Sequence, residues 1–220
     1  MQAIGINGSP RKSWNTAILL RKALAGAKSK GAKTEFVHLY DLSYKGCISC
    51  FSCKKIGGRS YGRCAVKDEL TPVLKRIAEA QVLILGSPLY FHTESGEMRS
   101  FMERLLFPYV TYTPERACIF PGETRTALIY TMNVSEENMA AYHQDVSVAA
   151  SRGVMTRVFG NCEALLSTDT LQFWIIRNMS RPSLTRSPKP GDMRRSSPGI
   201  ASGRMRWERD LSWGPWSSCY

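Results

Sequence analysis

The sequence predicts an α/β fold in which helices cover a doubly wound, five-stranded parallel sheet. Helix-like and strand-like segments alternate from residue 2 to residue 167 without an internal repeat, which is typical of βαβ units. The apolar run VLILG at residues 82–86 is typical of a parallel strand that is covered on both faces. Right-handed crossovers then favour the strand order 2-1-3-4-5, which places a ligand at the carboxyl ends of strands one, three and four.

The first half of the chain contains three of the five predicted strands. Apolar side chains at helical spacing predict a helix after residue 14, and Gly31 ends it. A second helix begins at Leu70, because apolar residues follow it at i+3, i+4, i+7 and i+8 and a proline lies in its first turn. The elements predicted here are a strand at 2–7, a helix at 15–29, a strand at 34–40, a helix from residue 70 and a strand at 82–86.

The second half of the chain adds the other two strands. A helix opens near Ser95 and carries Met98, Phe101 and Leu105 at helical spacing. Three prolines make residues 107–125 irregular. The remaining predicted elements are a strand at 126–132, a helix at 136–152 that continues loosely to 159, and a strand at 162–167.

The segment GSPRKSWNT, residues 8–16, joins the first strand to the first helix. A loop at this place directs backbone N–H groups and the positive end of the helix dipole at one point. It lacks both G-x-G-x-x-G and the G-K-[ST] ending of a P-loop, which argues against NAD as resident cofactor and against an NTPase. The segment therefore predicts a site for a terminal monophosphate, with a polar surface turn as the alternative. The candidate phosphate-binding residues are Ser9, Arg11, Lys12, Ser13, Asn15 and Thr16.

The segment SPLYFHTESGEMRSFMER, residues 87–104, begins with a loop after the third strand. Together with GSPRKSWNT it resembles the flavodoxin-like NAD(P)H-dependent FMN reductase family, over roughly residues 1–173. The resemblance implies a flavodoxin-like fold with FMN as cofactor and NAD(P)H as transient co-substrate. It also implies a small-molecule electron acceptor, such as a flavin, quinone or nitro compound, and a homodimer. Because the flavin itself takes up and passes on electrons, no catalytic residue is expected.

The resemblance assigns the same residues to the two ends of FMN. Ser9, Arg11, Ser13, Asn15 and Thr16 are expected at the phosphate, and Pro88, Leu89, Tyr90 and Phe91 beside the isoalloxazine ring. Backbone N–H groups from Tyr90 to Thr93 are expected to contact the ring, although core packing is the alternative for the two aromatic side chains. Trp14 and His92 depart from the family pattern, which usually has a small residue and a glycine there. His92 is either a loop histidine in solvent or, less in keeping with its place, a proton donor.

Four cysteines lie in the loop between the second strand and the second helix. Cys47, Cys50 and Cys53 form C-x2-C-x2-C, and Cys64 follows after ten residues. Thiolates at this spacing can surround an iron-sulfur cluster, and the family resemblance includes iron-sulfur flavoproteins, whose last spacer is usually shorter. A zinc site, a thiol-disulfide function and free thiols at the rim of the active site remain alternatives, so no metal ligand is assigned.

The net charge of +12 does not point to nucleic acid, because about half of it lies after residue 173. Apolar residues make up 43% of the chain, yet no run is long enough to span a membrane. No secretory signal opens the sequence. We therefore expect a cytoplasmic protein without a membrane or nucleic-acid partner, whose cysteines are thiols or ligands.

Residues 174–220 differ in composition from residues 1–173. They contain four of the five tryptophans and many of the Arg, Ser and Pro residues, without lasting helical or strand periodicity. Frequent prolines prevent the helix that would cover the last strand, so the covering helix is expected to be missing. An out-of-frame segment is the favoured interpretation. A disordered extension and a basic tail that binds polyanions by charge and stacking are the alternatives.

Overall fold

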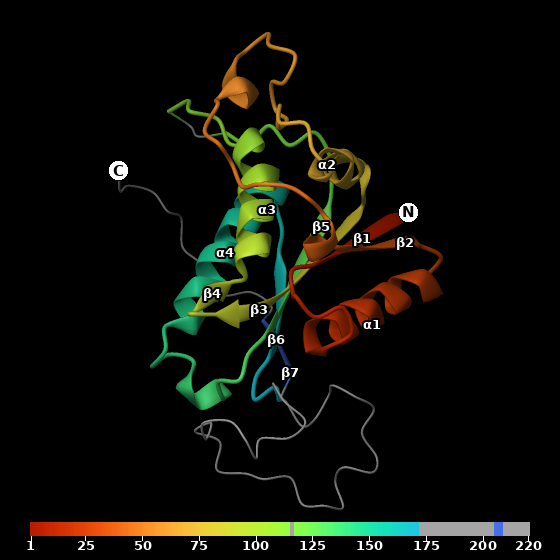
Figure 1. The fold of residues 1–220 in the computed structure, drawn as a ribbon, viewed down its shortest axis with the longest axis vertical. Helices are drawn as coiled ribbons and strands as arrows, with labels where there is room; N and C mark the ends of the chain where they lie inside the picture. Colours follow the sequence, from red (N-terminus) through yellow and green to blue (C-terminus); the bar gives the residue numbers. More distant parts are fainter. Residues whose placement is uncertain (115–116, 172–204, 209–220) are drawn as a thin grey trace, which may run out of the picture.

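The computed structural model of the chain describes residues 1–114 and 117–171, together with the backbone of residues 205–208. Its parallel strands lie in the order β2-β1-β3-β5-β6 (Figure 1). This confirms the predicted α/β class and the order 2-1-3-4-5. The strands are β1 (Gln2–Asn7), β2 (Lys33–His38), β3 (Val82–Tyr90), β4 (Thr93–Glu94), β5 (Arg125–Thr131), β6 (Glu163–Ser167) and β7 (Met205–Glu208).

Helices lie on both faces of the sheet (Figure 1). Leu20 and Leu24 of α1 pack on one face of the sheet, whereas α2, α3 and α4 contribute to the core on the other. The α-helices of the described residues are α1 (Asn15–Ser29), α2 (Leu70–Glu79), α3 (Gly96–Leu106) and α4 (Gln144–Phe159). The covering helix that was expected to be missing would follow β6, in residues 172–204, which lie outside the described residues.

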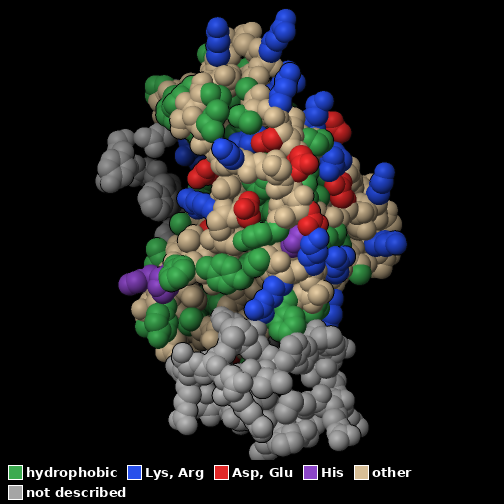
Figure 2. Space-filling model, viewed as in Figure 1, with side chains coloured by type: hydrophobic (Ala, Val, Ile, Leu, Met, Phe, Trp, Pro, Cys, Tyr) green, Lys and Arg blue, Asp and Glu red, His purple; other side chains and the backbone are tan. Residues whose placement is uncertain are grey.

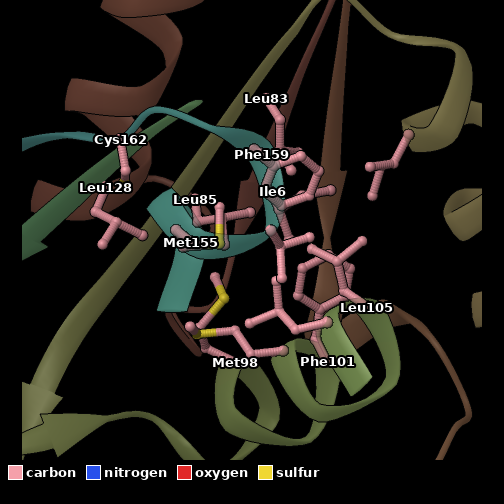
Figure 3. Packing of buried hydrophobic residues seen from close by; sticks show 14 of the residues in the cluster. Ile6, Leu83, Leu85, Met98, Phe101, Leu105, Leu128, Met155, Phe159 and Cys162 are labelled. Carbon is pink, nitrogen blue, oxygen red and sulfur yellow. The ribbon is translucent and has the colours of Figure 1, made fainter. Parts of the chain in front are cut away.

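The larger core forms between the sheet and helices α2, α3 and α4. Figure 3 shows Ile6, Leu83 and Leu85 of the central strands meeting Phe101 of α3 and Met155 of α4. The unbroken apolar run in β3 is explained by this packing, because the neighbouring Ile84 belongs to the separate core under α1. Both faces of β3 are thus covered, as the run predicted.

Three predicted boundaries are wrong. The second strand ends at His38 and not at residue 40, because Leu39–Asp41 form a 3-10 turn. The third strand does not end at Gly86 but continues to Tyr90, so the predicted loop at residues 87–90 is strand. The fourth helix does not begin at residue 136. Glu136–Asn138 form a single 3-10 turn, and α4 starts only after His143, whose φ of 53° is left-handed and cannot continue a right-handed helix.

Part of the segment predicted to be out of frame or disordered is a strand. Residues 205–208 form β7, which pairs antiparallel with β6 at the edge of the sheet. Its other residues lie outside the described part, so the interpretation of residues 174–220 and the domain boundary at 173 stay predictions. Among the described residues, no helix is long and apolar enough to cross a membrane, and the six described cysteines form no disulfide.

Candidate functional site

The loop that follows β1 is fixed by a close approach to α3. The backbone N–H of Gly8 donates to the carbonyl of Gly86, at 2.8 Å, and the Ser95 hydroxyl donates to the Gly8 carbonyl. A Cβ atom on Gly8 would lie only 2.7 Å from the Cβ of Met98. Only glycine therefore lets the loop lie this close to the start of α3.

The predicted phosphate residues divide into two groups. Ser9 is buried, and its hydroxyl accepts a hydrogen bond from the backbone N–H of Arg11 at 3.2 Å. The guanidinium of Arg11 lies 5.2 Å from the centre of the Trp14 ring. The Lys12 ammonium pairs with Asp41 at 2.6 Å, with both side chains largely exposed. Together with the exposed Ser13, these side chains form one open loop at the start of α1.

Asn15 and Thr16 belong to the second group, which contacts the protein instead. The side-chain amide of Asn15 donates to the Leu171 carbonyl at 3.0 Å, and the Thr16 hydroxyl lies 2.8 Å from that of Thr131. Both side chains are buried. They tie the start of α1 to the segment around β5 and β6, and their backbone N–H groups, in the first turn, have no earlier helical carbonyl to bond. The pair thus positions amides at the loop.

The second predicted loop is a hairpin. Leu89 pairs with Glu94 and Tyr90 with Thr93, so Phe91 and His92 alone make the turn between β3 and β4. Both have positive φ, 49° and 72°, as in the type I′ turns for which Asn-Gly is preferred. The departure from glycine at His92 was therefore the sequence signal for a strained turn. Strain of this kind, about 1–3 kcal/mol at each residue, is concentrated at functional sites.

The side chains of this turn point to solvent. Phe91 is 97% exposed and Tyr90 is 41% exposed, so neither is the core residue that the alternative interpretation required. The His92 ring stacks on that of Tyr142, with ring centres 6.1 Å apart. Figure 2 shows hydrophobic side chains gathered across the middle of this face, between basic ones. Exposed aromatic side chains beside an amide-rich loop suit a flat ring that carries a phosphate.

A buried carboxylate anchors the hairpin. Glu94 accepts hydrogen bonds from the hydroxyls of Tyr130 on β5 and Ser151 on α4. Burial alone would raise the pKa of Glu94, but these hydrogen bonds hold it below the ordinary value. An anionic Glu94 therefore joins the hairpin to two other elements. Sequence reasoning missed it, because nothing in the pattern placed these three residues together.

A buried histidine on β2 supports the loop that follows β1. The register of the sheet sets Asn7 opposite His38, and the Asn7 side-chain nitrogen lies 2.8 Å from Nδ1 of His38. The other amide atom of Asn7, its oxygen, accepts from the backbone N–H of Ser9 at 3.2 Å. His38 thus reaches the loop through Asn7, while its Nε2 is buried without a hydrogen-bond partner among the described residues. Sequence analysis gave no signal for this pair.

The charge state of His38 follows from its surroundings. Burial lowers the pKa of His38 below its ordinary value of 6.5. The Asp41 carboxylate opposes this shift, and the cations of Lys12 and Arg21 add to it. A neutral ring accepts the Asn7 hydrogen bond at Nδ1 and carries its proton on Nε2.

The four cysteines of the long loop line one pocket. Cys47, Cys50, Cys53 and Cys64 surround it, above the end of α3 (Figure 1, orange segment). The loop turns through Ser49 and Phe51, both with left-handed φ, 52° and 57°. Successive amides in such conformations form concavities that bind anions, iron-sulfur clusters included. Hydrogen bonds from Ser52 lower the pKa of the exposed Cys50 thiol.

The described side chains around this pocket do not form a site for a single metal ion. Within the described residues, no three His, Cys, Asp or Glu side chains are placed to hold one metal ion. A single zinc ion needs its ligands to converge on one point. A cluster distributes its thiolate ligands over several iron atoms, so cysteines around the wall of a pocket fit that group.

Comparison with known proteins identifies the family. A family model described as NADPH-dependent FMN reductase matches residues 1–149, more than half of the chain. The chain therefore belongs to the NADPH-dependent FMN reductase family, whose cofactor is FMN. The predicted resemblance is confirmed.

Curated relatives match the amino-terminal part of the chain. An iron-sulfur flavoprotein of Methanocaldococcus jannaschii is 40% identical over 104 residues, which are 47% of this chain and 51% of that protein. An iron-sulfur flavoprotein of Archaeoglobus fulgidus is 35% identical over 104 residues, which are 47% of this chain and 48% of that protein. The chain thus matches about half the length of these relatives.

Solved structures share the fold. The NAD(P)H:quinone oxidoreductase from Methanothermobacter marburgensis has a TM-score of 0.62 at 16% identity, over 78% of this chain and 88% of that one. An azoreductase from Bacillus anthracis has a TM-score of 0.57 at 20% identity, over 77% of this chain and 87% of that one. At these identities the likeness concerns the fold alone.

Replacing Gly8 with alanine tests the close approach. The added Cβ would meet Met98 and push the loop away from α3, and overpacking of this kind costs about 1–3 kcal/mol. The Kd for FMN, measured by quenching of flavin fluorescence, should rise about tenfold. Gly153→Ala is the matched control, because nothing lies within 4 Å of the new Cβ. Equal Kd values for the two variants would show that the approach does not position the loop.

The buried His38 predicts a pH dependence of stability. Well above pH 6.5 the ring is neutral in both the folded and the unfolded chain. Below pH 6.5 the unfolded chain binds the proton first, because the folded pKa is lower, so the free energy of unfolding falls as the pH falls. Urea unfolding at a series of pH values should show this slope, and His38→Asn should reduce it. His143→Asn, at an exposed histidine, is the control and should leave it unchanged. A slope that His38→Asn does not alter contradicts the assignment.

Proposed function

We propose that the chain is an FMN-dependent oxidoreductase that takes electrons from NAD(P)H and passes them to a small acceptor such as a flavin, quinone or nitro compound. The observation that carries the proposal is the meeting of the glycine-anchored loop after β1 with the strained hairpin after β3. The family match over residues 1–149 includes both. FMN supplies the exchange between two-electron and one-electron chemistry, so this chain needs no nucleophile of its own.

The described residues would bind FMN at its two ends. Ser9, Arg11, Lys12 and Ser13 would hold the phosphate, together with the first amides of α1, which Asn15 and Thr16 fix in place. The cations and the helix dipole both favour an anion there. In the structure the Lys12 ammonium lies 2.6 Å from the Asp41 carboxylate. To bind the phosphate, Lys12 must therefore leave Asp41 or contact both anions.

The hairpin would border the isoalloxazine ring. Pro88 and Leu89 belong to β3, and Tyr90, Phe91 and His92 form its exposed end. Because the turn is strained and anchored through the buried Glu94, its backbone N–H groups would have a fixed orientation even before a ligand binds. The exposed Phe91 would lie at the rim, where the nicotinamide or the acceptor approaches the ring.

A second candidate function is an electron carrier of the iron-sulfur flavoprotein kind, with FMN and a cluster in one chain. The specific observation in its favour is the pocket lined by Cys47, Cys50, Cys53 and Cys64. The long spacer before Cys64 does not prevent this, since the loop folds back to place all four at one pocket. The relatives at 40% and 35% identity are themselves named iron-sulfur flavoproteins.

The oligomeric state, the cellular location and the partners of the protein belong to the same proposal. A homodimer, the cytoplasm as location and the absence of a nucleic-acid partner stay predictions. The electron donor and acceptor are likewise proposals for this chain, because it matches only half the length of its relatives.

Anaerobic purification followed by three measurements tests both functions. We expect a flavin absorbance spectrum and oxidation of NADH or NADPH that depends on an added quinone or nitro compound. Flavin without any such oxidation would contradict the reductase. For the carrier we expect about four iron atoms and as many sulfides per chain, with iron lost and FMN retained in Cys50→Ser. Cys118→Ser, outside the pocket, is the control and should keep its iron. Protein without iron after reconstitution would contradict the carrier.

A further inference from the structure

Arg104, on the last turns of α3, is a buried charge that the FMN site does not use. Its side chain is 1% exposed and is among the largest fully buried side chains of the described residues. A guanidinium removed from water costs several kcal/mol unless its charge and its donors are satisfied. Its surroundings must therefore be arranged to accept it.

Each of the five N–H donors of Arg104 has an acceptor. Nη1 donates to Oδ2 of Asp68 at 2.8 Å and to the Lys45 carbonyl at 2.9 Å. Nη2 donates to Oδ1 of Asp68 at 3.2 Å and to the Val66 carbonyl at 3.4 Å. Nε donates to Sγ of Cys64 at 2.8 Å. This accounts for the whole donor set of an arginine.

These acceptors lie on both sides of the cysteine loop. Lys45 precedes Cys47, the first of the four cysteines, whereas Val66 and Asp68 follow Cys64, the last of them. One side chain thus fixes the entry and the exit of the loop, and it bonds one of the sulfurs directly. A lysine has a single nitrogen and cannot reach these acceptors in two directions at once.

The electrostatics at Cys64 are also set by Arg104. The N–H bond directed at Sγ places partial positive charge next to the sulfur, and the guanidinium charge lies behind it. Asp68 balances that charge at 2.8 Å and is only partly exposed. Hydrogen bonds to the sulfurs, net charge and solvent exposure are what set the reduction potential of a thiolate-bound cluster, and outer contacts of this kind also orient the ligands.

We propose that Arg104 is a positioning residue that holds Cys64 in place as a ligand and raises the reduction potential of the cluster bound by the four cysteines. The inference rests on the second candidate function. A cluster held there would gain one electron from reduced flavin, the reductant that the second candidate function supplies, and no bond to the protein would form or break. The added negative charge is stabilised by the nearby N–H donor and cation.

A redox titration of the reconstituted full-length protein, followed by electron paramagnetic resonance, tests this inference with two opposite variants. Arg104→Lys keeps a positive charge but loses the bond from Nε to Sγ, so the midpoint potential should fall. Asp68→Asn removes the balancing negative charge and keeps Arg104, so the potential should rise. Arg99→Lys, at a largely exposed arginine on the same helix, is the matched control and should not shift the potential.

A second readout needs no cluster. In the metal-free protein, Cys64 should react with an alkylating reagent at a different rate in Arg104→Lys than in the wild type, because the N–H bond to its sulfur is lost. Mass spectrometry of the labelled peptide follows this residue alone. Equal rates in the two proteins would overturn the positioning role.

The possible outcomes separate this inference from the function on which it rests. Wild-type protein without iron or sulfide would end the carrier function, and the inference with it. Iron in the wild type with an unchanged potential in both variants would overturn the inference alone. If Arg104→Lys loses its cluster, the midpoint potential of Asp68→Asn alone tests the inference. A potential of Asp68→Asn that is not higher than that of the wild type would then overturn the effect of Arg104 on the potential.

Discussion

The absence of a side chain at Gly8 is the constraint on which the site depends. A Cβ atom there would lie 2.7 Å from Met98. The loop after β1 can therefore pack this closely against α3 only when residue 8 is glycine. The amides of the first helical turn, the hairpin after β3 and the buried Asn7–His38 pair lie at the same edge of the sheet, where this contact holds the loop. Packing and hydrogen bonding explain the position of each of these features, and we propose that together they form a site for an anion with an attached flat ring.

Helix α3 links the two candidate redox sites. At its start, Ser95 caps the helix by accepting from the Met98 N–H and donates to the Gly8 carbonyl. Near its end, Arg104 closes the cysteine loop. These two residues are separated by roughly 14 Å of helical rise. One short rigid element therefore sets the phosphate loop and the cysteine pocket relative to each other, which is what an exchange of electrons between two groups requires.

The sequence predicted the parts of the fold that follow from local pattern. The boundaries of α1 and the strand order were correct, because apolar periodicity and crossover handedness determine them. The extension of β3 to Tyr90 was missed because the proline in SPLYF suggests the end of a strand. The strand continues past this proline, and its last two residues pair with the short β4. The start of α4 was also missed, because nothing in the local sequence indicates that His143 has a left-handed backbone conformation. The roles of Glu94, His38 and Arg104 required knowledge of tertiary neighbours, whereas the polar loop after β1 and the cysteine spacing are visible in the sequence.

We propose that the loop after β1 holds the phosphate of FMN, and a comparison of FMN with riboflavin tests this most directly. The two ligands share the ring and differ in the phosphate. Two charge-assisted hydrogen bonds at about 1.5 kcal/mol each correspond to a Kd about 100-fold lower for FMN. Titration of the apoprotein by flavin fluorescence should give this ratio. Equal affinity for the two ligands would contradict the account.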